Sequence, residues 1–480
     1  MSSSTEKLNV KGLSDEETVT LNHLVEQLAS KKPRNGLRSS YYDGKRAVNS
    51  IGSVIPPQYA NIGLALGWAA KGVDGLANRC NLDQMVWPDG TLADLGMGEL
   101  ADSNFLFSEF AAGRTDSLIH GVSYLITTQG VDGEPAALVH AKDALNATGD
   151  WNPRTRRLDN LLSVTSWHEG KITGFVLYLS GLTITAEKSG GKWTSDRSEH
   201  PWGVPVEPQM FKSRASRRMG TSRISRPVMG YQDAALRALI RMEAHMDIYT
   251  IPKMILLGAS DSAFTNADGT AKNSWQVALG RVFGLEDDED AMNPRADVKQ
   301  FDASSPAPHL SQLNALAKLM AREVDLSDSD FALTDMANPT SEGALGRADQ
   351  TLISTSEQAT DGWSVGTRRT VTRALAIQNG LTEIPKEWAS IVPRWRKPQY
   401  MSKAAEADAG AKQVAAVPWL AETTVGLRLL GLDDIDIAEA QAERRRNTSS
   451  SLLENLRANA EQAKTDPAVA AAASSRTGLV

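Results

Sequence analysis

Two amphipathic segments on either side of an acidic insert constrain the fold of this chain more than any other feature of its sequence. Residues 232–250 carry apolar side chains at alternating steps of four and three, namely Ala235, Leu239, Met242, Met246 and Tyr249. Residues 306–325 repeat this kind of spacing with Leu310, Leu313, Ala317, Met320 and Val324. Because such spacing gives each helix one apolar stripe, the sequence predicts two helices that pack against neighbouring helices.

The insert between these two segments, residues 258–303, is acidic. It holds nine Asp and Glu against four Lys and Arg, a net charge of −5. Five of these acids are consecutive: Glu286, Asp287, Asp288, Glu289 and Asp290. The run lacks the glycine and the alternating ligands of a calcium loop, so we interpret it as a solvated charged surface in preference to a metal site. The Asn-Ala-Asp-Gly sequence at 266–269 predicts a turn within the insert.

Helical spacing also marks the first eighty residues. Residues 15–31 predict an amphipathic helix that ends at a breaker, 32–36, and residues 59–81 predict a second helix. An aromatic-flanked turn is expected between them at 41–44. The expected core residues are Val19, Leu21, Leu24, Val25 and Leu28 in the first helix and Leu64, Leu66, Trp68, Val73 and Leu76 in the second.

From residue 117 to about 206 the pattern changes to short runs rich in Val, Ile, Thr, Tyr and Leu, separated by turn residues. Strands are predicted at 118–127, 161–167, 173–179 and 182–188. Gly190-Gly191 predicts a turn, and the Trp-His-Glu-Gly sequence at 167–170 is most simply explained as a hairpin turn. The sequence therefore predicts an antiparallel β subdomain within an α+β chain.

A long helix is predicted in the last third of the chain. After a loop at 334–340, residues 341–378 favour a helix that Gly343, Gly346, Gly362 and Gly366 bend and that Asn379-Gly380 closes. From residue 401 the composition turns to Ala, Glu, Gln and Arg with helical preference. Residues 460–480 are Ala-rich with little to bury, which predicts a frayed end.

Length and composition narrow the class of protein. With 480 residues, of which 41% are hydrophobic and 23% charged, the chain is expected to form two to four globular domains. Cys80 is the single cysteine, so no intrachain disulfide can form, and its apolar helical surroundings predict a buried bystander. A polar N-terminus and the lack of a stretch of ~20 apolar residues argue against export and membrane insertion.

The charge balance bears on nucleic acids. A net charge of −7 is not typical of a free-standing DNA binder, which gains affinity by releasing counterions from phosphate. Residues 212–226 nevertheless hold six basic residues and no acid: Lys212, Arg214, Arg217, Arg218, Arg223 and Arg226. A nucleic-acid patch is one interpretation, and a solvated loop or a salt-bridge strip between subunits is favoured over it.

Catalytic motifs were sought and not found. Residues 189–193 contain Gly-Gly-Lys without the following Ser or Thr of a phosphate-binding loop, and residues 121–125 lack the second glycine of a nucleophile elbow. The histidines at 23, 120, 140, 168, 200, 245 and 309 never pair at metal-ligand spacing. We therefore expect no catalytic residue, no metal and no cofactor.

Several ordered stretches resemble one protein family. The sequence Gly-Thr-Ser-Arg-Ile-Ser-Arg-Pro-Val-Met at 220–229, with 231–237, 251–253 and 256–258 after it, is similar to portal proteins of long-tailed (siphovirus) bacteriophages of actinobacteria. The resemblance continues at Trp275, at the acidic run and at Asn-Pro-Thr-Ser-Glu-Gly-Ala, 338–344. It covers roughly residues 41–380 in order, and Gly343 departs from the helix-favouring residue that the family often has there.

The resemblance implies a phage portal fold, with a mainly α-helical stem and crown and an α/β wing with antiparallel strands. Its parts would be the wing (1–229), a first stem helix (230–257), the clip (258–303), a second stem helix (304–325), the tunnel loop region (326–342), a long kinked helix with the wing return (343–400), and the crown with a C-terminal tail (401–480).

Candidate functional residues follow from the same resemblance. The residues expected to pack the stem helices are Leu239, Met242, Met246, Leu313 and Met320. The surface of the clip that docks partners would hold Trp275, Glu286, Asp287, Asp288, Glu289 and Asp290. The tunnel loop that faces DNA would hold Asp335, Met336, Asn338 and Thr340.

The implied function is structural. Usually twelve copies form a ring at one vertex of the virion capsid, assembled in the host cytoplasm, through which double-stranded DNA is packaged and ejected without sequence specificity. Implied partners are the terminase large subunit, a head-to-tail adaptor and the major capsid protein, with no membrane. The alternative is a metal-dependent DNA-processing enzyme, a nuclease or recombinase that uses clustered acids. A head-completion adaptor is disfavoured, because adaptors are usually much shorter.

Overall fold

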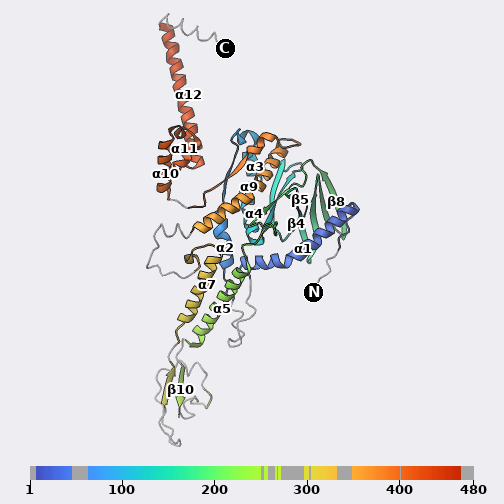
Figure 1. Cartoon of the computed structure of the whole chain (residues 1–480), viewed down its shortest axis with the longest axis vertical. Coiled ribbons are helices and arrows are strands. Elements are labelled where there is room, and N and C mark those ends of the chain that lie inside the picture. Colours follow the sequence, from blue (N-terminus) through green and yellow to red (C-terminus); the bar gives the residue numbers. More distant parts are fainter. Residues whose placement is uncertain are drawn as a thin grey trace. The chain divides into compact units, whose positions relative to one another are not determined.

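The computed structural model describes residues 7–45, 63–249, 253–257, 265–266, 269–271, 297–301, 304–331, 349–399 and 402–465. It confirms an α+β chain in which every strand pairing is antiparallel among these residues (Figure 1). The chain divides into two compact units, Met1–Pro398 and Gln399–Val480, and each is considered by itself.

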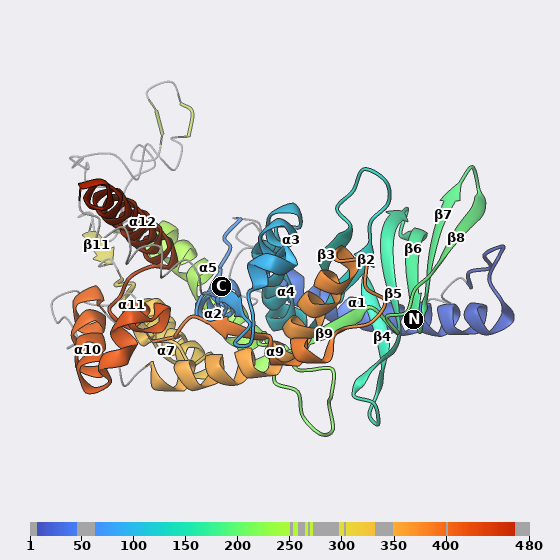
Figure 2. The same ribbon diagram turned by 90° about the horizontal axis from the view of Figure 1, so that it is seen from above.

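The larger sheet of the first unit is a meander of five strands in the order β4-β5-β6-β7-β8 (Figure 2). These strands are β4 (Ala147–Asn152), β5 (Arg157–His168), β6 (Lys171–Leu179), β7 (Leu182–Ser189) and β8 (Lys192–Glu199). Glu169 and Gly170 have φ angles of 49° and 77°, and Gly190 and Gly191 of 57° and 82°. Two consecutive left-handed residues are what a tight two-residue hairpin requires, so both predicted turns are confirmed.

Helix α1 (Asp15–Tyr42) packs against this sheet. It begins with a capping box in which the Ser14 hydroxyl accepts from the Glu17 N–H and the Glu17 carboxylate accepts from the Ser14 N–H. Three of the predicted core residues, Leu21, Leu24 and Leu28, are buried in one cluster with sheet residues such as Phe175. Val19 was predicted to join them, but its side chain is 70% exposed.

The prediction that this helix ends at residues 32–36 is wrong. Pro33 lies inside α1, which continues to Tyr42. The residues beyond Pro33 make long-range bonds: Asn35 Nδ2 donates to Ala144 O at 2.9 Å, Arg38 Nη1 to His120 O at 2.8 Å, and the Tyr41 hydroxyl to Asp233 Oδ2 at 2.8 Å. These contacts offset the cost of an internal proline, ~3 kcal/mol. The predicted turn follows at Asp43 and Gly44.

A second sheet of three strands, in the order β3-β2-β9, lies between helices. Its strands are β2 (Val122–Gln129), β3 (Ala137–Lys142) and β9 (Val206–Met210). Helix α4 (Leu106–His120), which follows η2 (Leu92–Leu95) and α3 (Met97–Ser103) in the sequence, packs on this sheet. The strand predicted from residue 118 begins only at Val122. Leu118 belongs to the last turn of α4, which Gly121 ends with a φ of 100°.

Helix α2 is shorter than predicted. It spans Trp68–Ala77, and residues 63–67 before it are not helical. Trp68, Val73 and Leu76 are buried as expected, whereas Leu64 and Leu66 are half-buried. After α2 comes the strand β1 (Leu82–Val86). It pairs with β12 (Val392–Trp395), which follows η5 (Lys386–Ser390) near the end of the first unit.

The long helix α9 (Gln350–Gln378) closes at Asn379 and Gly380, as predicted, but runs without a break through Gly362 and Gly366, where interruptions were expected. Its expected start, 341–348, falls among residues that the structure does not describe. Gly366 allows α9 to approach β9 closely, because a Cβ at this position would lie 2.6 Å from Gln209 Nε2. This contact sets α9 directly on the three-stranded sheet.

The second unit is helical over its described residues, as predicted. It contains α10 (Lys403–Ala416), η6 (Pro418–Glu422), α11 (Thr424–Leu429) and α12 (Asp434–Thr465). Gly410 and Gly426 meet the carbonyl groups of Leu429 and Leu420 so closely that neither position has room for a side chain. These two contacts hold α10, η6 and α11 together.

Candidate functional site: the paired helices α5 and α7

Helices α5 (Arg226–Tyr249) and α7 (Ala307–Glu323) run side by side, and the two stretches predicted as striped helices are both helical (Figure 1). Beyond α5 the chain enters β10 (Lys253–Leu257), which pairs antiparallel with β11 (Asp297–Phe301) before α7 begins. In this register Lys253 faces Phe301 and Leu257 faces Asp297. The chain therefore leaves through α5, forms a two-stranded ribbon, and returns through α7.

Near the start of each helix, a serine hydroxyl accepts a hydrogen bond from a backbone N–H. Ser225 Oγ accepts from the Val228 N–H at 3.3 Å at the start of α5, and it donates to Glu323 Oε1 at the end of α7 at 2.8 Å. Ser305 Oγ accepts from the Ala307 N–H at 3.2 Å, although the N-cap residue of α7 is Pro306, which has no side-chain cap bond. The Ser225 contact also fixes the first turn of α5 to the last turn of α7.

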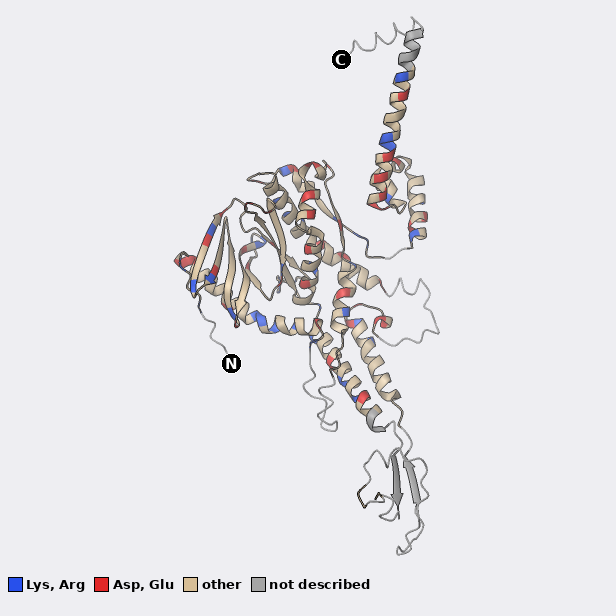
Figure 3. Cartoon of the chain, turned by 180° about the vertical axis from the view of Figure 1, so that it is seen from behind, with Lys and Arg blue, Asp and Glu red and all other residues tan. Residues whose placement is uncertain are grey.

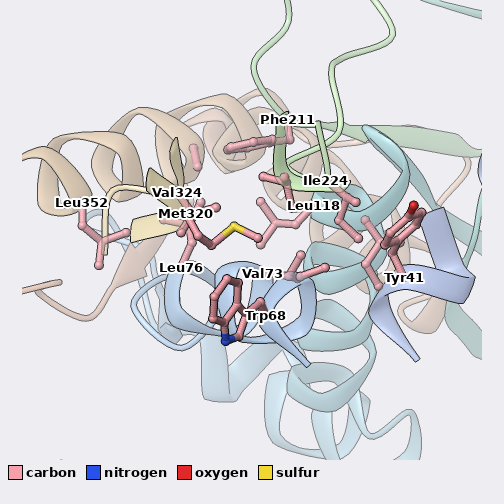
Figure 4. Packing of buried hydrophobic residues seen from close by; sticks show 14 of the residues in the cluster. Tyr41, Trp68, Val73, Leu76, Leu118, Phe211, Ile224, Met320, Val324 and Leu352 are labelled. Atoms are coloured by element: carbon pink, nitrogen blue, oxygen red, sulfur yellow. The ribbon is translucent and has the colours of Figure 1, made fainter. Parts of the chain in front are cut away.

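The inner ends of the pair are anchored in a hydrophobic cluster. Met320 and Val324 of α7 pack with Leu76 of α2 and Leu118 of α4, and Figure 4 shows the Met320 thioether among these side chains. The cluster also takes in buried residues of α5 and α9: Ala235, Leu352, Ala359 and Trp363. The pair thus packs on α2, α4 and α9 together. In the sequence, α7 is followed by η4 (Asp328–Asp330), close to the end of this described range.

A buried arginine completes this anchor. Arg223 Nε donates to Gly72 O of α2 at 2.6 Å, and Nη2 donates to Val324 O at the C-cap of α7. The guanidinium group thus lies at the negative end of the α7 dipole. Burial lowers the pKa of Arg223 to about 10, with Asp325 opposing the shift. The sequence grouped Arg223 with five other basic residues as a solvated or binding strip, which is wrong for this residue.

The predicted stem-packing residues differ in burial. Met320 is buried, and Leu239, Met242 and Leu313 are half-buried. Met246 is 42% exposed and Leu319 on α7 is 44% exposed. A single chain thus covers only part of the apolar surface of this pair.

Two histidines meet across the pair, and the sequence analysis missed them. His245 Nε2 donates to Ser304 O at 3.1 Å, so in the neutral ring Nδ1 can accept from His309 Nε2, which lies 3.3 Å away. The rings are 5.1 Å apart between centroids, at 79°. Spacing along one helix could not reveal this contact; aligning the two predicted helices antiparallel around the insert could have.

Several other titratable groups with shifted pKa values lie in the first unit, outside α5 and α7 themselves. Burial, opposed by Asp143, lowers the pKa of His120 to about 4, and burial with Asp143 raises the pKa of Asp116 to about 7. Cys80 is buried beside Ser356 Oγ at 3.3 Å, and burial raises the pKa of its thiol, which fits the predicted bystander.

The described ranges contain no group of three or more His, Cys, Asp or Glu side chains that could hold a metal ion. None of the helices within these ranges is both long and apolar enough to cross a membrane. The predicted clip residues Trp275 and Glu286 to Asp290 fall outside the described residues. So do the predicted tunnel-loop residues Asp335, Met336, Asn338 and Thr340.

Comparison with known proteins gives one family. The family model described as "Phage portal protein, SPP1 Gp6-like" matches residues 21–450. The portal protein of Mycobacterium phage L5 is 26% identical over 384 residues, covering 78% of this chain and 77% of that protein. The portal protein of Mycobacterium phage D29 is 26% identical over 383 residues, with the same coverage.

Among solved structures, a chain from the neck of a native GTA particle computed with C12 symmetry aligns with a TM-score of 0.41 at 14% identity. The alignment covers 82% of this chain and 99% of that one. A chain from the neck of an empty GTA particle computed with C6 symmetry aligns with a TM-score of 0.40 at 15% identity, covering 77% and 90%.

The anchor predicts a specific stability loss. In Arg223→Lys, one ammonium group cannot reach two carbonyl groups on different helices, which leaves a buried acceptor unsatisfied at a cost of ~1–3 kcal/mol. Urea unfolding of the full chain is expected to show this loss, with faster amide exchange in the last turn of α7. The exposed Arg226→Lys serves as control, with a change within about 0.5 kcal/mol. Equal effects of the two substitutions would contradict the anchor.

Proposed function

This chain belongs to the SPP1 Gp6-like family of phage portal proteins, and from that premise we propose how its described parts build and use a ring. The chain is a structural protein whose copies form a homo-oligomeric portal ring at a capsid vertex of the virion, through which DNA is packaged. The family and the named relatives give no support to the alternative of a metal-dependent DNA-processing enzyme. The observation that carries the function is one family match along residues 21–450.

Ring closure is proposed to use the apolar surface that one chain leaves uncovered on the α5–α7 pair. Met246 and Leu319 are more than 40% exposed, and Leu239, Met242 and Leu313 are only half-buried. In a closed ring every pair has a neighbour on both sides, so each copy can cover the exposed apolar groups of the next. Covering one such side chain contributes on the order of 1 kcal/mol, and closure repeats the gain at every interface. Twelve copies is the proposed number.

Passage of DNA is proposed to depend on weak contact with the channel wall. Each phosphate neutralised by Lys or Arg strengthens binding without regard to sequence, and many such contacts would hold the polymer in place. A net charge of −7 per chain limits the electrostatic attraction between the protein and the DNA phosphates. Asp335, Met336, Asn338 and Thr340, in the segment that follows η4, are proposed to face the DNA during packaging and ejection.

Partner docking is proposed to occur through the segment beyond the β10–β11 ribbon, which contains Trp275 and the acidic run from Glu286 to Asp290. The proposal is supported by chain order: this segment connects β10 to β11, and that ribbon follows α5 and precedes α7. The proposed partners there are the terminase large subunit and then a head-to-tail adaptor, with the major capsid protein contacting the ring elsewhere. Assembly in the host cytoplasm is part of this proposal.

The ring model predicts a selective assembly defect. Met246→Glu with Leu319→Glu removes two exposed apolar groups and places charges in the interface, while exposed substitutions cost the single chain little. The chain concentration needed for half-assembly should rise at least about tenfold, which corresponds to ~1.4 kcal/mol per interface. Mass photometry measures this. Val131→Glu, 69% exposed on a wing loop, is the control and should assemble normally. Normal assembly of the double variant would contradict the proposed interface.

The docking proposal predicts a separable defect. Replacing all five acids from Glu286 to Asp290 with lysine should weaken capture of purified terminase large subunit or adaptor, because charge complementarity steers such encounters. Ring formation should be unchanged. The matched control reverses five exposed acids of the wing: Asp15, Glu16, Glu187, Asp196 and Glu199. Undiminished capture by the first variant, or equal loss in both, would refute docking through the acidic run.

A further inference from the structure

The loop between β9 and α5 is an ordered feature that the portal function does not account for. At its base, the Phe211 N–H donates to Gly121 O at 3.0 Å, at the end of α4, and the Thr221 N–H donates to Phe211 O at 2.7 Å. At its tip, Arg214 and Arg217 exchange two backbone hydrogen bonds of 3.1 and 2.9 Å. Ser213 Oγ donates to Arg218 O at 2.8 Å. These bonds hold three arginines on one tight turn.

Helix α1 brings further basic residues to the same place because it continues through Pro33. Arg38 donates to His120 O, the last residue of α4, next to the Gly121 carbonyl that anchors the loop. Burial, together with the nearby charges of Arg34 and Arg217, lowers the pKa of Arg38 to about 10. Figure 3 shows acidic residues at the first turn of α1 and basic residues farther along it. The charges of Arg34 and Arg217 therefore both lie near Arg38, which contacts the end of α4.

We call Arg34, Arg214, Arg217 and Arg218 the arginine patch. Three of these side chains are exposed and Arg217 is half-buried. Within the described part of the chain, none of the four forms an ion pair, whereas Arg197 on the neighbouring sheet pairs with Glu17 at 2.7 Å. Like charges that gather without a counter-charge repel each other, and an anionic partner would relieve this repulsion.

The chemistry of the patch favours phosphate. Each guanidinium group offers a planar fork of N–H donors that bonds two phosphate oxygens at once, and it keeps its charge at any physiological pH. The turn between β4 and β5 carries three more exposed arginines, Arg154, Arg156 and Arg157, and Figure 2 shows this turn and the 211–220 loop extending toward the same side. Two basic loops fit an extended polyanion better than a single small anion.

We propose that the arginine patch binds the phosphate backbone of double-stranded DNA, outside the tunnel-loop contact proposed above and without sequence preference. The inference rests on the proposed function to the extent that a portal ring meets packaged DNA. Carboxylates of an acidic protein surface accept the same bidentate bonds, so the choice of DNA rests on the two basic loops that extend toward one side, which suit an extended polyanion. The patch would then bind DNA in a salt-sensitive way, while the channel wall contacts the DNA only weakly.

The test is fluorescence anisotropy of a labelled 30-base-pair duplex with the full-length protein, across a series of salt concentrations. The variant Arg214→Glu, Arg217→Glu, Arg218→Glu is compared with a control of equal charge change at distant exposed lysines: Lys11→Glu, Lys188→Glu, Lys192→Glu. The patch variant should bind at least about tenfold more weakly, and the slope of log affinity against log salt should fall by about 2–3, since each lost phosphate contact removes ~0.9. The control should change much less.

Two further arms keep the outcome decisive. If the glutamate variant does not fold, Arg214→Gln, Arg217→Gln, Arg218→Gln must show the same reduction in slope. Ring formation of every variant is followed by mass photometry, so loss of the ring and loss of DNA binding are separate readouts. Equal weakening by the patch variant and the control, an unchanged salt slope, or a patch variant that loses the ring but keeps DNA binding would each overturn the proposal, the last assigning the patch to contacts between copies.

Discussion

The α5–α7 pair can extend from the rest of the first unit because its inner ends are fixed through both backbone and side-chain contacts. Packing of Met320 and Val324 against α2 and α4 supplies the apolar part of this anchor. Arg223 supplies the polar part, since helix termini leave carbonyl groups without partners and a buried helix end requires a donor. With this end fixed, the opposite end of the pair leads into the β10–β11 ribbon.

Two apolar side chains of the pair, Met246 and Leu319, remain more than 40% exposed beside charged ones such as Glu243 and Lys318. In the proposed ring, a neighbouring copy would cover them with the same surface of its own pair. His245 and His309 join the two helices near the ribbon through a hydrogen bond, so contacts connect the pair at both ends.

Much of the fold could be predicted from local chemistry, and the failures share one cause. Gly170 and the pair Gly190-Gly191 adopt left-handed backbone at little cost, as tight hairpin turns require, so both hairpins were predictable. Pro33 was read as a breaker because its cost is local, while the bonds of Asn35, Arg38 and Tyr41 that outweigh it come from distant residues. The anchoring role of Arg223 and the His245–His309 contact are likewise invisible until helices are placed in space. The portal assignment itself came from the order of motifs along the chain, because nothing in the residues alone specifies a ring.

The central claim is that copies close into a ring through neighbouring α5–α7 pairs. Single-particle electron microscopy of the purified full-length chain, at a resolution that separates helices, tests it most directly. The account predicts a ring with a central hole, in which each pair lies against the pair of the next copy and Met246 and Leu319 are covered there. A compact monomer under every assembly condition, or a ring whose pairs do not touch, would contradict it.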